Sequence, residues 1–104
     1  MEDVSVDEVN RLCKQYLRDI YERKRSYETI TYSDLADFLG CDRRTVKAAL
    51  DPESNVKVSA SLIFCLAEYM TIPPEELFKQ MAAYTRNELN SEKIENFTNS
   101  GAKR

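Results

Sequence analysis

The chain has 104 residues and a mass of 12.1 kDa, which suffices for one domain and excludes two domains of ordinary size. Hydrophobic residues make up 42% and charged residues 32%, with two glycines and three prolines, so collagen-like, disordered and sandwich-type sequences are excluded and helices are favoured. A formal net charge of −3 and a pI of about 5.0 exclude a chain that is basic throughout.

No segment resembles a membrane span or a secretory signal. The longest apolar run, residues 62–67, is far shorter than the roughly 20 residues that cross a bilayer. The first three residues are Met1, Glu2 and Asp3, without the basic start and apolar stretch of a signal peptide. We therefore expect a cytoplasmic protein with no membrane partner.

Neither a metal site nor an enzyme is indicated. The three cysteines, Cys13, Cys41 and Cys65, are widely spaced, and no histidine is present to complete a zinc site. Each cysteine falls at an apolar-periodic position, which predicts small buried thiols in a reducing compartment. Without histidine, a nucleophile motif or a glycine-rich phosphate loop, we expect no catalytic residue and no cofactor.

The first predicted helix covers about residues 6–25. Its apolar residues recur at steps of three and four from Val6 to Ile20, and Ser5 followed by Glu8 is typical of a capping box. The other face carries basic residues, among them Arg11, Lys14 and Arg18.

Two short helices are predicted next, at about 32–39 and 43–50. Thr31 is a candidate N-cap with Asp34 three residues later, and Gly40 stands where a left-handed residue ends a helix. Asp42 can cap the following helix, whose Val46 and Leu50 share one face. The two helices are thus joined by a tight turn.

A fourth helix is predicted at about 60–70 and a fifth at about 74–89. Ser59 is the N-cap of the fourth, and Pro74 fits the first turn of the fifth. Beyond Asn90 the sequence is polar, so residues 92–104 are predicted to be a flexible tail. The expected architecture is an all-α domain over 1–91 followed by this tail.

The second and third helices match the requirements of a helix-turn-helix. Ala36 is small where the helices approach, Gly40 follows four residues later, and Val46 follows after six more. Through residues 34–47 (DLADFLGCDRRTVK) the chain resembles the lambda-repressor-like, Cro-type helix-turn-helix family. The resemblance extends over about residues 8–80 and implies a five-helix domain that binds double-stranded DNA, usually as a dimer, with its third helix in the major groove.

The resemblance also implies which residues contact DNA. Those expected to read bases are Arg43, Arg44, Thr45 and Lys47, and a phosphate contact is equally expected for Lys47. Those expected to bind phosphates lie at the start of the second helix and in the loop after the third: Thr31, Tyr32, Ser33, Asn55, Lys57 and Ser59. Apolar residues of the fifth helix exceed what one inward stripe requires, so a homodimer interface is expected at Phe78, Met81, Tyr84 and Leu89. Met81, like Leu77, is also a candidate for the core.

Two functions remain open at this point. The first is a transcriptional regulator, a repressor of phage, plasmid or bacterial type, that binds a palindromic operator as a dimer. The second is a protein-interaction module on the same scaffold, an antitoxin-like or phage-encoded inhibitor that does not bind DNA by itself. Residues 42–57 hold four basic and three acidic side chains, and this modest charge favours the second, whereas the pair Arg43 and Arg44 favours the first.

Overall fold

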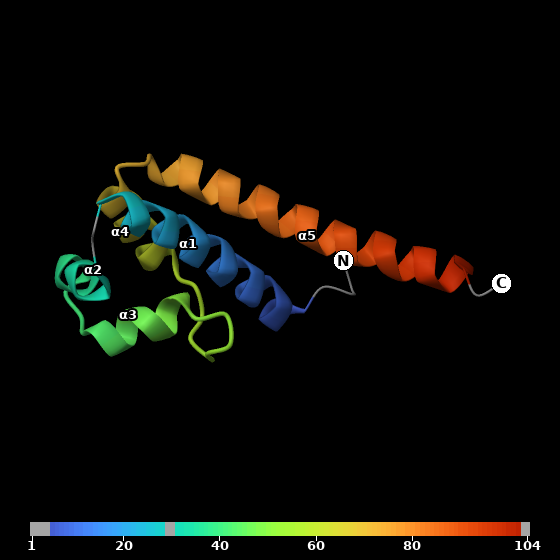
Figure 1. Ribbon diagram of the computed structural model, residues 1–104, viewed down its shortest axis with the longest axis horizontal. Helices are drawn as coiled ribbons and strands as arrows, with labels where there is room; N and C mark the ends of the chain where they lie inside the picture. The colour runs from blue at the N-terminus through green and yellow to red at the C-terminus, as the bar shows by residue number, and fades with distance from the viewer. Residues whose placement is uncertain (1–4, 29–30, 103–104) are drawn as a thin grey trace.

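The described part of the chain is entirely helical. The structure, a computed structural model, describes the backbone of residues 5–28 and 31–102 and the side chains of residues 5–25 and 31–91. Within these ranges no strand occurs, and the elements are α1 (Val6–Glu28), α2 (Tyr32–Leu39), α3 (Arg43–Leu50), α4 (Ala60–Met70) and α5 (Pro74–Ala102) (Figure 1). The all-α prediction is confirmed, as are the predicted bounds of α2, α3 and α4.

Four helices begin at the N-caps that the sequence predicts. In α1 the Ser5 hydroxyl accepts hydrogen bonds from the backbone N–H groups of Asp7 (3.1 Å) and Glu8 (3.4 Å). Thr31 accepts a hydrogen bond from the backbone N–H of Asp34, and the Asp34 carboxylate accepts one in return from the Thr31 N–H. Asp42 accepts from the N–H of Thr45, and Ser59 from that of Leu62. Each cap satisfies N–H groups that have no partner within their own helix, which explains why these positions start helices.

The first and fifth helices are longer than predicted. α1 runs to Glu28 rather than 25, and α5 runs to Ala102, so the backbone of residues 92–102 is helical where we expected a flexible tail. Between Pro74 and Gly101 the sequence has no glycine or proline to interrupt the helix. Residues 1–4 of the predicted domain and 103–104 of the tail lie outside the described residues. No helix in the described segments is both long and apolar enough to cross a membrane.

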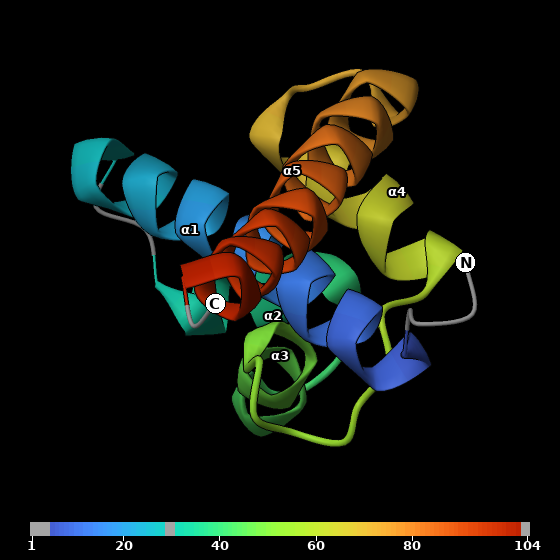
Figure 2. The same ribbon diagram turned by 90° about the vertical axis from the view of Figure 1, so that its right-hand side faces the viewer.

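α1 is the centre of the arrangement. Figures 1 and 2 show α5 along one side of α1 and the α2–α3 pair on the opposite side. α1 contacts both α5 and α3, while α4 contacts α2 and α5. The core lies where these helices meet, and its members with almost no exposed surface include Leu17, Tyr21, Leu35, Val46, Leu50, Leu66 and Leu77.

The cysteine prediction is only partly right. Cys13 is buried, but Cys41 is exposed and Cys65 is half-buried. Cys41 follows Gly40 in the turn between α2 and α3, where the chain no longer has helical periodicity. The helical pattern that suggests an inward side chain therefore does not apply there.

Candidate nucleic-acid interface

The turn between α2 and α3 fixes how these two helices are held together. Gly40 has φ 73° and ψ 31°, a left-handed conformation that glycine adopts at little steric cost. The next N–H, from Cys41, donates to the Ala36 carbonyl at 3.0 Å, and that of Gly40 donates to Asp37 at 3.3 Å. These bonds end α2 within one residue, so α3 starts almost immediately after it.

α3 has one buried side and one exposed side. Val46 and Leu50 are buried in the core, at about 1% exposure each. The predicted base-reading residues all lie outside that buried stripe and are exposed: Arg43, Arg44, Thr45 and Lys47. All four side chains therefore project from the part of α3 that is not anchored in the core, with Thr45 and Lys47 on its two flanks.

The first turn of α3 carries two cations and no acid. Arg43 and Arg44 directly follow the N-cap Asp42. The positive end of a helix dipole favours anions, so arginines there are a small cost to folding. Hydrogen bonds from the Thr45 and Arg44 backbone hold the pKa of Asp42 below its usual range, which keeps the cap ionised. The end of α3 that lies next to α2 thus exposes two cations beside the ionised Asp42.

The three residues predicted to bind phosphate at the start of α2 differ in their surroundings. Thr31 and Ser33 are exposed, although the Thr31 hydroxyl is already the acceptor of the capping bond. Tyr32 is half-buried, and its hydroxyl donates to Glu22 Oε1 at 2.6 Å. The Tyr32 hydroxyl is therefore engaged within the protein, in contrast to the exposed donor that the sequence suggested.

The surroundings of Tyr32 also determine its ionisation. Burial is the main cause that raises the pKa of Tyr32 to about 12, and the hydrogen bond to the Glu22 carboxylate adds to it. The ring packs against Tyr21, with centroids 5.1 Å apart and planes tilted by 45°. Tyr32 therefore remains a neutral hydrogen-bond donor across the physiological range.

The loop between α3 and α4 holds the other three predicted phosphate-binding residues. Asn55 is exposed, Lys57 forms an ion pair with Asp7 of α1 at 3.0 Å, and the Ser59 hydroxyl caps α4. The loop and α3 lie along the same edge of the molecule in Figures 1 and 2. An anion at that edge is accessible to Asn55 without rearrangement, whereas Lys57 must leave Asp7.

Lys14 holds this loop in place, which the sequence did not suggest. Its side chain is fully buried, and its ammonium group donates to the carbonyls of Ser54 (3.1 Å) and Val56 (2.6 Å) and to the Ser54 hydroxyl (2.6 Å). Burial lowers the pKa of Lys14, while the nearby Asp51 carboxylate acts in the opposite direction. Lys14, one of the basic residues on the face of α1 opposite its apolar stripe, is therefore a structural link from α1 to the loop.

The four residues predicted to form a dimer interface do not share one surface. Phe78 is 54% exposed, but Met81 is only 3% exposed and belongs to the core. Tyr84 is half-buried, where its ring packs on Tyr16 and its hydroxyl accepts from Gln15 at 2.7 Å, and Leu89 is half-buried as well. Met81 lies four residues after Leu77 on the inward stripe of α5, which explains its burial.

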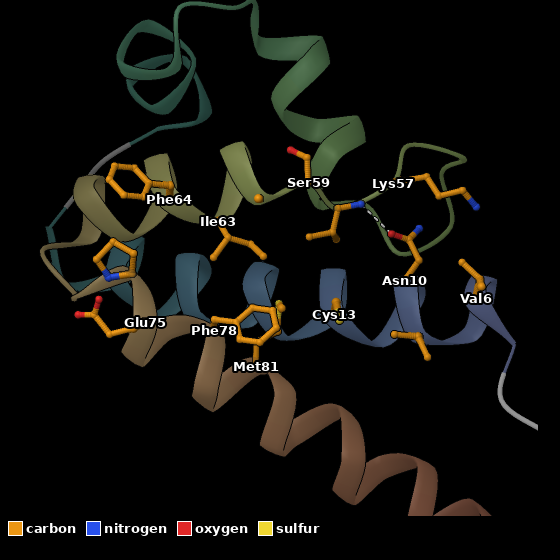
Figure 3. Close-up of a pocket in the computed structure, with 14 residues that line it drawn as sticks. Val6, Asn10, Cys13, Lys57, Ser59, Ile63, Phe64, Glu75, Phe78 and Met81 are labelled. Atoms are coloured by element: carbon orange, nitrogen blue, oxygen red, sulfur yellow. Dashed lines mark hydrogen bonds between the residues drawn. The ribbon is translucent and has the colours of Figure 1, made fainter. Parts of the chain in front are cut away.

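Phe78 lies instead at an apolar groove of about 560 Å³ between α1, α4 and α5 (Figure 3). Two other strongly exposed apolar side chains line it, Val6 from α1 and Phe64 from α4. Phe64 directly follows the buried Ile63, so one step around α4 moves it from the core to the surface. Only the helix register, and no motif, could have predicted this groove from the sequence.

Among the described residues, no three His, Cys, Asp or Glu side chains meet in a way that could hold a metal ion.

The chain matches none of the protein-family models, curated proteins or solved structures with which it was compared.

Proposed function

We propose that the protein is a sequence-specific DNA-binding transcriptional regulator, a repressor of phage, plasmid or bacterial type. The observation that carries the proposal is the exposed set Arg43, Arg44, Thr45 and Lys47 on a helix whose Val46 and Leu50 are locked in the core. A short, rigidly held helix with an exposed polar side is what major-groove reading requires. In this proposal α3 enters the groove and α2 lies across the backbone.

The chemistry of α3 supports base reading. Arginine presents two donors in a fork that matches the O6 and N7 acceptors of guanine, and one such contact discriminates against a wrong base by about 1–3 kcal/mol. Arg43 and Arg44 stand at the helix end where positive charge is unfavourable for folding alone. When α3 contacts a polyanion, the same two charges would attract it.

The overall acidity of the chain is compatible with DNA binding because the charges are unevenly distributed. Residues 11–25 hold six basic and two acidic side chains, whereas residues 1–10 hold four acids and no base. At 0.15 M salt, charges separated by more than about 8 Å are largely screened, so the local field of α3 matters more than the net charge.

A dimer is part of the proposal. One α3 reads a single half-site, and two copies related by a two-fold axis would place their α3 helices about 34 Å apart on a palindromic operator. Of the four residues expected at the interface, Phe78 is the one that remains strongly exposed. We propose that it packs against a second copy.

The proposal is tested by selecting duplexes from a random-sequence pool at about 50 and 200 mM salt, between which phosphate-driven binding weakens steeply. A dimeric regulator enriches a palindrome whose half-sites are about one helical turn apart. Absence of enrichment together with absence of salt-dependent binding would contradict the proposal.

A matched pair of variants assigns the contact surface. Arg43→Ala/Arg44→Ala removes two cations from α3, and Lys79→Ala/Arg86→Ala removes two exposed cations from α5. The Arg43→Ala/Arg44→Ala variant should lose at least about 1–3 kcal/mol of operator affinity. It should keep the helical circular dichroism spectrum, because both side chains are exposed. The second should bind nearly as the unmodified chain does. Equal losses would show that only overall charge matters.

The apolar groove at Phe64 and Phe78 favours a second candidate function. A protein-interaction module would use this exposed surface to bind another protein and would leave α3 in solvent. The duplex selection distinguishes the two, because the module enriches no sequence.

A further inference from the structure

Three helices meet around the ring of Tyr32, the first residue of α2. Its hydroxyl is bonded to Glu22 of α1, and its ring packs on Tyr21. Lys47 of α3 places its ammonium group 5.8 Å from the centre of the same ring, and the Arg25 guanidinium of α1 lies 5.2 Å from it. The ring of a fixed aromatic side chain therefore faces two cations from two different helices.

Lys47 occupies a different part of α3 from Arg44. One residue step turns about 100° around a helix, so Lys47 follows the buried Val46 by about a quarter turn and stays close to the protein. Arg44 lies two steps before Val46 and projects nearly opposite the core. A side chain on the flank of a groove-reading helix is aimed at the wall of the groove, where the sugar-phosphate backbone runs.

We propose that Tyr32 is a positioning residue that holds Lys47 toward one phosphate of bound DNA, so that Lys47 contacts the backbone and not a base edge. This inference rests on the proposed function. It changes the role expected for Tyr32, which donates nothing to the phosphate. Of the two roles expected for Lys47, it selects the phosphate contact over base reading.

The physical reason lies in the flexibility of lysine. A free lysine has four rotatable bonds and must be ordered when it binds, whereas one resting on an aromatic face is already restricted. Tyr32 is suited to this because Glu22 and Tyr21 fix its own orientation. No ion pair competes for Lys47 within the described part of the chain.

The test measures binding of a fluorescein-labelled 30-base-pair duplex of mixed sequence at several salt concentrations. Each neutralised phosphate contributes about 0.9 to the slope of log affinity against log salt, which corresponds to about eightfold in affinity at 0.1 M. Lys47→Ala should lower the magnitude of this slope by about 0.9 and the affinity at 0.1 M salt by about eightfold. Lys79→Ala, which removes an exposed lysine of α5, should leave the slope and the affinity unchanged.

Two substitutions at Tyr32 separate the ring from the hydroxyl. Tyr32→Leu removes the aromatic face and should weaken binding by about threefold to eightfold, whereas Tyr32→Phe keeps the face and should stay within twofold of the unmodified chain. The double variant Tyr32→Leu/Lys47→Ala should bind no worse than Lys47→Ala, because both changes remove one contact. Additive losses, or an unaffected Tyr32→Leu, would overturn the proposal.

A measurement without DNA keeps the test decisive if Tyr32→Leu fails to fold. The ring of Tyr32 should shift the NMR signals of the Lys47 methylene protons upfield in the unmodified chain and in Tyr32→Phe. Signals at random-coil positions would refute the contact. If the upfield shift is present but the duplex does not bind at any salt concentration, the proposed function fails while the packing holds. If the duplex binds and Lys47→Ala leaves the slope unchanged, only the present inference fails.

Discussion

The buried hydroxyl of Tyr21 lowers the stability of the fold. Tyr21 is fully buried, and its Oη has no hydrogen-bond partner among the described residues. A buried hydroxyl without a partner costs about 1–3 kcal/mol relative to water. Tyr21→Phe removes that atom and keeps the ring that packs on Tyr32, so the free energy of unfolding should rise by about 1 kcal/mol after the small packing loss.

The assay is thermal and urea unfolding followed by circular dichroism at neutral pH. For a domain of this size the gain corresponds to an increase in Tm of roughly 4–8 °C. Tyr16→Phe is the matched control: it removes an exposed hydroxyl that donates to Gln80 at 3.1 Å, and its effect should stay within about 0.5 kcal/mol. A loss of 1 kcal/mol or more in Tyr21→Phe would refute the reasoning, since it would mean that the hydroxyl is satisfied.

Four further predictions concern the backbone at two positions, the loop and pH. Thr71 ends α4 with φ 60°, a left-handed conformation that is strained for a β-branched residue, so Thr71→Gly should stabilise the chain by about 0.5–1 kcal/mol. Gly40→Ala should destabilise the chain by about 1 kcal/mol through backbone strain alone, because a Cβ at Gly40 meets no atom within 4 Å. Urea unfolding measures the effects of Thr71→Gly and Gly40→Ala. Lys14→Met leaves the Ser54 carbonyl without its buried donor and should cost about 1–3 kcal/mol, with faster amide hydrogen exchange in the loop at 51–59 as the second readout. Burial raises the pKa values of Tyr21 and Tyr32 to about 12, so the folded state resists ionisation of these two groups. Their titration leaves the free energy of unfolding unchanged below about pH 10 and lowers it as pH rises from about 10 to 12. Tyr21→Phe should lose less stability over that range, and a free energy of unfolding that stays constant between about pH 10 and 12 would contradict the assigned burial.

Local signals account for the parts of the fold that were predicted. The side chains of Thr31, Asp42 and Ser59 each accept a hydrogen bond from an N–H three residues away, and Gly40 adopts the left-handed conformation of its own turn. Each of these interactions lies within a short stretch of sequence. The bounds of α2, α3 and α4 followed from these positions. The exposure of Arg43 and Arg44 followed from the same helix register.

The remaining features depend on contacts between residues far apart in sequence. Lys14 looks like any lysine on a basic helix face, and only the approach of Ser54, 40 positions later, explains its burial. Tyr32 is likewise explained by Glu22 and Lys47, which belong to the helices before and after α2. The far end of α5 was mispredicted for another reason: a polar sequence without a breaker permits a helix as readily as a tail.

The enclosed ammonium group of Lys14 has a practical consequence for following the molecule in solution. Amine-specific acylating reagents need an accessible, deprotonated amine, and Lys14 offers no accessible surface while the loop at 51–59 is closed over it. Its acylation rate, read by mass spectrometry beside that of exposed Lys79, would report how often the loop separates from α1. Acylation of Lys14 thus measures how often the segment that follows α3 opens.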